Sequence, residues 1–84
     1  MPHPHLLHRK GEPLTPRQRQ VARLLAAGRG NKQIAHILGI STKTVETHRA
    51  GVYARVGVQS ALQFVIWAVR QGLIKIERDD GPSL

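Results

Sequence analysis

The fold is decided by residues 31–52, which read NKQIAHILGISTKTVETHRAGV. The first part of this stretch has the apolar spacing of one helix face, at Ile34, Ala35, Ile37 and Leu38. This spacing predicts a short helix over 31–38. Gly39 follows, and glycine permits the left-handed backbone that a sharp turn requires. Ser41 is then the expected N-cap of a second helix over 42–56.

The second helix of this stretch has one apolar side and one polar side. Val45, Val52 and Val56 share a face, because they are spaced at i, i+7 and i+11. The outward positions are basic, small or hydroxyl-bearing, with one acidic exception: Lys43, Thr44, Glu46, Thr47, Arg49 and Ala50. Two short helices joined by a tight turn, the second basic and rich in hydroxyl groups, are the layout of a helix-turn-helix, whose second helix enters the DNA major groove.

The helix before this motif has clear start and stop signals. Thr15 is its expected N-cap, Pro16 suits the first helical position, and Gln18 completes a T-x-x-Q capping box. The apolar face consists of Val21, Leu24 and Leu25. Gly28 suits the C-terminal cap.

The helix after the motif carries more apolar surface than one core contact needs. It is predicted over 60–71, with a second capping box at its start and Gly72 at its end. On a helical wheel its apolar side consists of Ala61, Phe64, Val65, Ala68 and Val69. Leu62 and Ile66 flank this side on one edge, and Trp67 lies on the other edge. The surplus indicates a surface that meets a partner.

Length and composition restrict the class of protein. At 84 residues, one domain is expected. There are no cysteines, which excludes a disulfide and a thiolate metal site. The longest apolar run, Phe64 to Val69, is far too short to span a bilayer, and the first residues lack the apolar segment of a signal peptide. We therefore expect a cytoplasmic protein that does not enter membranes.

The net charge of +8 is unevenly distributed. Residues 1–75 hold twelve basic residues and two acidic ones, whereas residues 76–84 hold one basic and three acidic residues. A basic body with an acidic end fits a polyanionic partner such as DNA.

The chain is expected to divide into three segments. Residues 1–13 hold three of the five prolines and form a predicted flexible arm, 14–76 form the domain, and 77–84 form an acidic tail. Apart from Leu73 to Ile76, no segment alternates as a strand would. The predicted fold class is therefore all-α, with four helices.

An enzyme is not expected, and neither is a cofactor or a metal site. The sequence has no glycine-rich phosphate loop, paired acidic site or nucleophile–base pattern. His3, His5 and His8 lie close together, but a proline-rich arm fixes no ligand geometry around them. No small-molecule ligand is predicted within this chain.

Several separated motifs together resemble the LuxR-type (NarL/FixJ, GerE-like) DNA-binding domain of bacterial transcription regulators. These motifs are LTPR at 14–17, NKQIA at 31–35, LGIS at 38–41, TVETH at 44–48 and VGV at 56–58. The resemblance covers about Leu14 to Leu73. It implies a four-helix domain whose third helix enters the major groove and whose fourth helix forms a homodimer. Such a domain often stands at the C-terminus of a larger regulator, and the sequence leaves open whether this chain is a stand-alone member.

The sequence departs from the family pattern in three respects. Gly30 stands where the family usually has serine or threonine as the cap of the second helix. Glu46 stands where the family often has lysine. A carboxylate there repels phosphate but can accept a hydrogen bond from N4 of cytosine. Leu62 and Ile66 are apolar where the family often has polar residues, which favours a dimer.

The resemblance also implies roles for individual residues. Base contacts are predicted for Lys43, Glu46, Thr47 and Ala50. Phosphate contacts are predicted for Asn31, Lys32, Ser41, Thr42, Thr44, His48, Arg49 and Arg55. Ser41 has a second expected role as a helix cap, which is compatible with phosphate contact. For His48 the alternative is a histidine packed on the inner edge of the helix. The dimer interface is predicted at Leu62, Ile66, Trp67 and Val69.

The predicted function is a sequence-specific, dimeric transcription regulator that binds a palindromic operator in double-stranded DNA through helix 42–56. RNA polymerase is a further candidate partner. One alternative is a promoter-binding domain like region 4 of a sigma factor, which would bind as a monomer together with polymerase. Another is a protein-interaction module that acts through helix 60–71.

Overall fold

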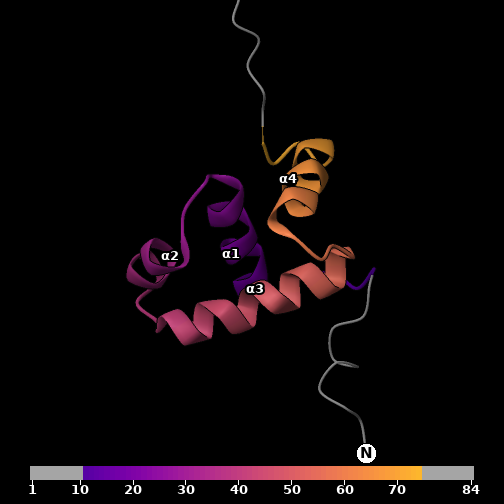
Figure 1. The fold of residues 1–84 in the computed structure, drawn as a ribbon. Helices are drawn as coiled ribbons and strands as arrows, with labels where there is room; N and C mark the ends of the chain where they lie inside the picture. The colour runs from indigo at the N-terminus through magenta and orange to yellow at the C-terminus, as the bar shows by residue number, and fades with distance from the viewer. Residues whose placement is uncertain (1–10, 75–84) are drawn as a thin grey trace, which may run out of the picture.

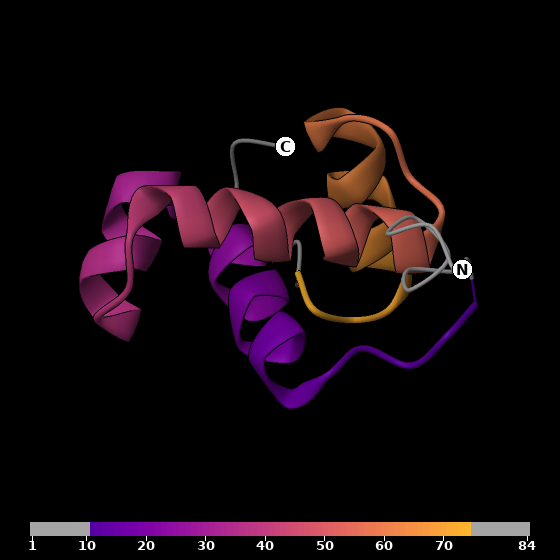
Figure 2. The ribbon, with the colours of Figure 1, turned by 90° about the horizontal axis from the view of Figure 1, so that it is seen from below.

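The computed structural model describes residues 11–74, and its helices are α1 (Pro16–Ala26), α2 (Asn31–Leu38), α3 (Thr42–Val56) and α4 (Ala61–Arg70). In two perpendicular views α3 lies across α1, while α2 lies beside the start of α3 and α4 beside its later half (Figure 1, Figure 2). No strand occurs within the described residues. The prediction of an all-α domain with four helices is confirmed.

The two ends of the chain lie largely outside this description. Of the predicted arm over 1–13, only residues 11–13 are described. The predicted tail over 77–84, the last two residues of the predicted domain and the histidines at positions 3, 5 and 8 lie outside the described residues.

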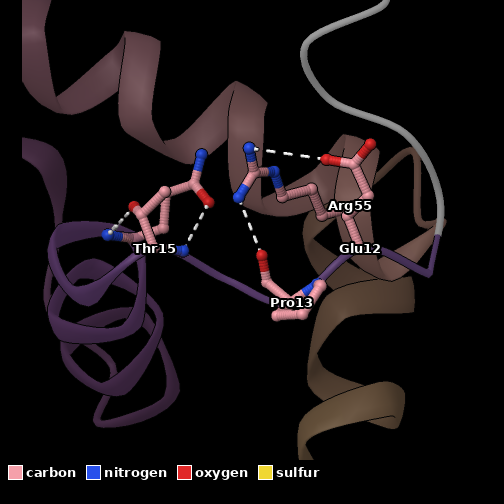
Figure 3. Close-up of polar contacts among 5 residues, drawn as sticks. Glu12, Pro13, Thr15 and Arg55 are labelled. Atoms are coloured by element: carbon pink, nitrogen blue, oxygen red, sulfur yellow. Dashed lines mark hydrogen bonds and ion pairs between the residues drawn. The ribbon is translucent and has the colours of Figure 1, made fainter.

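Helix α1 begins with the predicted capping box. The hydroxyl of Thr15 accepts a hydrogen bond from the Gln18 backbone N–H, and the Gln18 side-chain oxygen accepts one from the Thr15 N–H, both at 3.1 Å (Figure 3). Two N–H groups that the helix leaves unpaired are thereby satisfied. Pro16 occupies the first turn, and the helix ends at Ala26 with Ala27 as its C-cap, one residue before Gly28, whose φ is +84°.

The turn between α2 and α3 forms as the sequence predicts. Gly39 adopts φ +67° and ψ +36°, which is the left-handed region. The N–H of Ile40 donates to the carbonyl of Ala35 at 3.0 Å. Ser41 then caps α3, because its hydroxyl accepts from the Thr44 N–H at 3.0 Å. Both helices have the predicted bounds.

The start of α4 differs from the prediction. The Ser60 hydroxyl accepts from the Gln63 N–H at 3.2 Å, as expected. The Gln63 side chain, however, accepts from the N–H of Gln59 at 2.7 Å rather than from that of Ser60. The predicted capping box is therefore wrong in its return bond. The helix also ends at Arg70, with Gln71 as its cap.

The core consists of two clusters joined by α1. The first contains the buried residues Val21, Ile34, Ala35 and Val45, with Leu24, Leu25, Leu38 and Ile40 packed around them. The second contains the buried residues Ala22, Val52, Phe64 and Ala68, with Leu14, Leu25, Ala26, Tyr53, Val56, Val58, Trp67 and Ile74 around them. Because adjacent residues of α1 enter different clusters, α1 connects the α2 end of the domain to the α4 end.

The inward face of α4 is narrower than the helical wheel predicts. Phe64 and Ala68 are buried, but Ala61 is exposed and Val65 is 42% exposed. Trp67, predicted at the dimer interface, instead packs on Phe64, with ring centroids 5.6 Å apart. The apolar arc of α4 could pack in several rotations, and the aromatic contacts of Phe64 select the one observed.

Within the described residues, no single helix is long and apolar enough to cross a membrane. Among the same residues, α3 and α4 taken together are long and apolar enough, but they are bent by 59° relative to each other.

We predict that Gly39→Ala destabilises the domain. A Cβ at Gly39 would meet open space, so the cost comes from the backbone, which an L-residue adopts at a cost of roughly 1–2 kcal/mol. Unfolding in urea should show this loss. Gly30→Ser is the matched control: Gly30 lies at an ordinary φ of −81°, and a serine cap there should stabilise by a few tenths of a kcal/mol. Equal stability of Gly39→Ala and the parent chain would contradict the prediction.

Candidate nucleic-acid interface

One face of α3 is open and carries all the residues predicted to contact bases. Lys43, Glu46, Thr47 and Ala50 are exposed, and their spacing of three, four and seven places them on one side of the helix. The opposite side is closed, because Val45 and Val52 have no exposed surface. The core therefore determines which residues α3 presents outward.

Two of the hydroxyls on α3 are held by local hydrogen bonds. The Thr47 hydroxyl donates to the carbonyl of Lys43 at 3.2 Å, which fixes the direction of its remaining acceptor positions. The hydroxyls of Ser41 and Thr44 lie 2.8 Å apart and bond to each other. Ser41 and Thr44 are exposed, whereas Thr42 and His48 are half-buried at the edges of the helix.

The start of α2 lies next to this face and is open to an anion. Gly30 offers no side-chain cap, although the Gln33 side chain accepts from the Gly30 N–H at 3.0 Å. A helix start with uncapped N–H groups favours phosphate. Asn31 from this start and Arg49 from α3 line the same hollow of about 270 Å³, together with Glu46, Ala50 and Tyr53.

Sequence reasoning missed the role of Tyr53. Its hydroxyl accepts a hydrogen bond from Nε of Arg49 at 3.1 Å, and the guanidinium carbon lies 5.2 Å from the ring centroid. Arginine and tyrosine four residues apart are neighbours on a helix surface, so the spacing alone carried the signal.

Arg55 is engaged within the chain instead of facing outward. Its Nη1 donates to the carbonyl of Pro13 at 2.7 Å, and its Nη2 lies 3.6 Å from a carboxylate oxygen of Glu12 (Figure 3). Its own carbonyl accepts from the N–H of Gly11 at 2.7 Å. The side chain is only 13% exposed. Among the predicted phosphate contacts, Arg55 thus bonds to residues that lie far from it in the sequence, at the entry to α1, and we propose that it does not belong to the interface.

A second open surface runs along α4. Leu62 is 69% exposed and Ile66 is 45% exposed, as a predicted partner surface requires. Val69 and Trp67 are half-buried. Two apolar residues outside the predicted set extend the surface, Val65 at 42% and Leu73 at 40% exposure.

Metal-binding geometry is not found among the described residues, in which no group of three or more histidine, aspartate or glutamate side chains comes together. The histidines of the arm fall outside that region.

Comparison with known proteins identifies the family. The sequence profile described as "Bacterial regulatory proteins, luxR family" matches residues 12–68. The chain belongs to the luxR family of bacterial regulatory proteins. Its relatives carry the names of transcription regulators, and α2, the turn at Gly39 and α3 have the layout of a helix-turn-helix.

Curated relatives are longer than this chain. It is 40% identical over 63 residues to the transcriptional regulatory protein MctR of Rhizobium johnstonii, a match that covers 75% of this chain and 29% of MctR. It is 48% identical over 52 residues to the transcriptional regulatory protein UhpA of Escherichia coli, covering 62% of this chain and 26% of UhpA. In these matches the chain spans less than a third of the relative's length.

A solved structure shares the fold. The crystal structure of the Vibrio cholera VqmA–ligand–DNA complex superimposes with a TM-score of 0.70 at 34% identity. The match covers 77% of this chain and 28% of that chain. The shared part is therefore the helical domain described above.

We predict that Arg55 stabilises the fold and does not bind phosphate. Arg55→Gln removes a charge-assisted hydrogen bond in a half-buried position, so unfolding in urea should show a loss of roughly 1–3 kcal/mol. Glu12→Gln should change stability by less than about 1 kcal/mol, because that ion pair is partly exposed. The salt dependence of DNA binding should stay the same in Arg55→Gln; a weaker dependence would show that Arg55 contacts phosphate.

Proposed function

We propose that this chain reads a specific operator sequence in double-stranded DNA, with α3 in the major groove. The observation that carries the proposal is the open face of α3, where Lys43, Glu46 and Thr47 point away from a core that buries Val45 and Val52. A major groove admits one α-helix, and side chains on its outer face reach base edges.

Each residue of this face has a chemistry that suits a base edge. Lys43 can donate to the O6 and N7 acceptors of guanine, and Glu46 can accept from N4 of cytosine. Thr47 offers an acceptor and a methyl group, and Ala50 offers an apolar contact that suits the methyl of thymine. We assign these four residues to base readout.

The phosphate contacts would come from the rim around this face. The uncapped start of α2 brings Asn31 and Lys32, and α3 adds Ser41, Thr42, Thr44, His48 and Arg49. Such contacts supply much of the affinity through released counterions, and binding should fall steeply as salt increases.

The exposed face of α4 fits a second copy of the chain. Leu62, Ile66 and Val65 present adjoining apolar surface, and Leu73 continues it beyond the end of the helix. Two copies related by a two-fold axis would place two α3 helices in successive major grooves. The operator would then be an inverted repeat with half-sites about one helical turn apart.

Larger assemblies are also part of the proposal. The chain spans under a third of relatives such as UhpA, and an additional signal-receiving domain would account for the remainder of such a protein.

Because its target would be chromosomal DNA in a bacterium, we propose that the protein acts in the cytoplasm. RNA polymerase is the expected partner once the operator is occupied.

Base readout is tested by comparing two lysines. Lys43→Ala should weaken operator binding by ~1–3 kcal/mol and relax the preference at one base position. Lys32→Ala, the matched control at the start of α2, should weaken binding to all sequences alike and reduce the magnitude of the salt slope by about 1. Selection of bound sequences from random DNA, followed by titrations at several salt concentrations, measures both effects.

The outcome separates the possibilities. Unchanged selectivity in Lys43→Ala would remove Lys43 from base readout. If the parent chain prefers no sequence over bulk DNA, α3 is no reader at all, and a protein-interaction module acting through α4 becomes the better interpretation. Binding as a monomer only with polymerase would favour the sigma-like alternative.

The dimer is tested by placing a charge on α4. Ile66→Glu should leave the helical content unchanged and give a monomer in sedimentation, because a carboxylate would be buried at the contact between copies. Ile37→Glu is the control, since Ile37 is 52% exposed on α2, away from the proposed interface. On operator DNA the parent chain and the control should bind as two copies. A dimer that survives Ile66→Glu would move the interface elsewhere.

A further inference from the structure

The side chain of Arg49 is held in place by its neighbour on α3. Its Nε donates to the Tyr53 hydroxyl at 3.1 Å, and its guanidinium carbon lies 5.2 Å from the centroid of the same ring. Both contacts come from one residue, so they constrain the direction of the guanidinium as well as its distance. No other described side chain bonds to Arg49, which leaves both terminal nitrogens available as donors within residues 11–74.

Tyr53 is itself held in place by a contact with the core. Its ring stacks on Phe64 of α4, with centroids 5.6 Å apart and planes inclined by 21°. Phe64 is only 2% exposed and belongs to the second core cluster. Tyr53 therefore connects the core of the domain, through its ring, to a cation at the surface, through its hydroxyl.

The fixed guanidinium lies beside the start of α2. Arg49, Tyr53 and Asn31 line two hollows in common, one of about 270 Å³ towards Glu46 and one of about 310 Å³ towards Ala61 on α4. The uncapped N–H groups at the start of α2 favour an anion at the same place. Two independent features of the chain thus favour negative charge at this edge of α3.

We infer that Tyr53 is a positioning residue, which holds Arg49 in the orientation that grips a DNA phosphate beside the start of α2. The inference rests on the proposed function, because it takes Arg49 as a phosphate contact. Arginine loses considerable rotamer freedom when it binds, and a side chain that is already oriented loses less. Tyr53 acts through Arg49 and touches no DNA itself.

The test is Tyr53→Phe in the full chain. Phenylalanine keeps the ring that stacks on Phe64 and faces the guanidinium, and it removes only the hydroxyl that accepts from Arg49. The affinity for the selected operator should fall roughly three- to tenfold, the usual effect of one lost hydrogen bond. The unfolding midpoint should stay within about 2 °C of the parent value, since an isolated half-exposed change of this kind is a small part of stability.

A double-mutant cycle distinguishes positioning from a general effect on the fold. Arg49→Gln should reduce the magnitude of the salt slope by about 1, as expected for one lost phosphate contact. In the Arg49→Gln background, Tyr53→Phe should change operator affinity less than twofold, because the group that it positions is gone. In the background of Arg23→Gln, an exposed arginine of α1, Tyr53→Phe should keep its full effect.

A spectroscopic readout accompanies the affinities. The Nε–H signal of Arg49 should be resolved and slow to exchange in the parent chain, and should lose that protection in Tyr53→Phe. If Tyr53 had a structural role alone, Tyr53→Phe would not change this signal without also changing the unfolding midpoint.

The results of these measurements separate a failure of the positioning role of Tyr53 from a failure of the proposed function. Equal effects of Tyr53→Phe with and without Arg49 would overturn the positioning role, and so would an Arg49→Gln variant with unchanged salt slope. Either result would leave the proposed function standing, provided that the parent chain still selects an operator. Failure of the parent chain to select any sequence would overturn the proposed function first, and this inference with it.

Discussion

Burial of Val45 and Val52 fixes the rotation of α3 about its own axis, and the remainder of the interface depends on that rotation. The two valines are seven residues apart, lie on one side of the helix and have no exposed surface. Burying such a side chain contributes roughly 1.5–3 kcal/mol. Successive residues of a helix are rotated by about 100° about its axis. If α3 packed in a register shifted by one residue, both valines would be exposed, and Lys43 and Thr47 would turn away from the open face. Because each valine belongs to a different cluster, packing at both ends of the domain enforces the same orientation.

The same helix is anchored at its end by contacts that are far apart in the sequence. Arg55, in the last turn of α3, holds the carbonyl of Pro13 and faces the carboxylate of Glu12. A cation there also interacts favourably with the negative end of the helix dipole. The chain leading into α1 is thereby tied to the end of α3, and Leu14 packs into the second cluster beside it. A count of basic residues cannot show this, because it does not distinguish a charge that contacts the chain itself from one that is open to a partner.

Features that depend on neighbours in sequence could be predicted, and features that depend on tertiary contacts could not. Thr15, Gly39 and Ser41 mark helix ends because their effect requires only the next few residues. The prediction of which side of α4 faces inward was partly wrong. A broad apolar arc can pack in several rotations, and the stacking of Phe64 on Tyr53 selects one of them. The contacts of Arg55 could not be predicted either, because its partners stand more than forty positions earlier in the sequence. The exposed positions 43, 46, 47 and 50 followed correctly from the spacing of the valines alone.

Glu46 lies near one basic side chain and the uncapped start of a helix. It lines the hollow beside the start of α2 together with Arg49 and Asn31, where the chain otherwise favours an anion. In the proposed complex, a carboxylate in that position would repel phosphate whatever the sequence, which would weaken binding to bulk DNA. At an operator that offers N4 of cytosine, the same carboxylate would accept a hydrogen bond that offsets this repulsion. Specificity is a difference between two affinities, and a group that is unfavourable on most sequences and neutral on one increases that difference. We therefore expect Glu46 to lower total affinity and raise selectivity, with the basic rim of α2 and α3 supplying the attraction that makes such a residue tolerable.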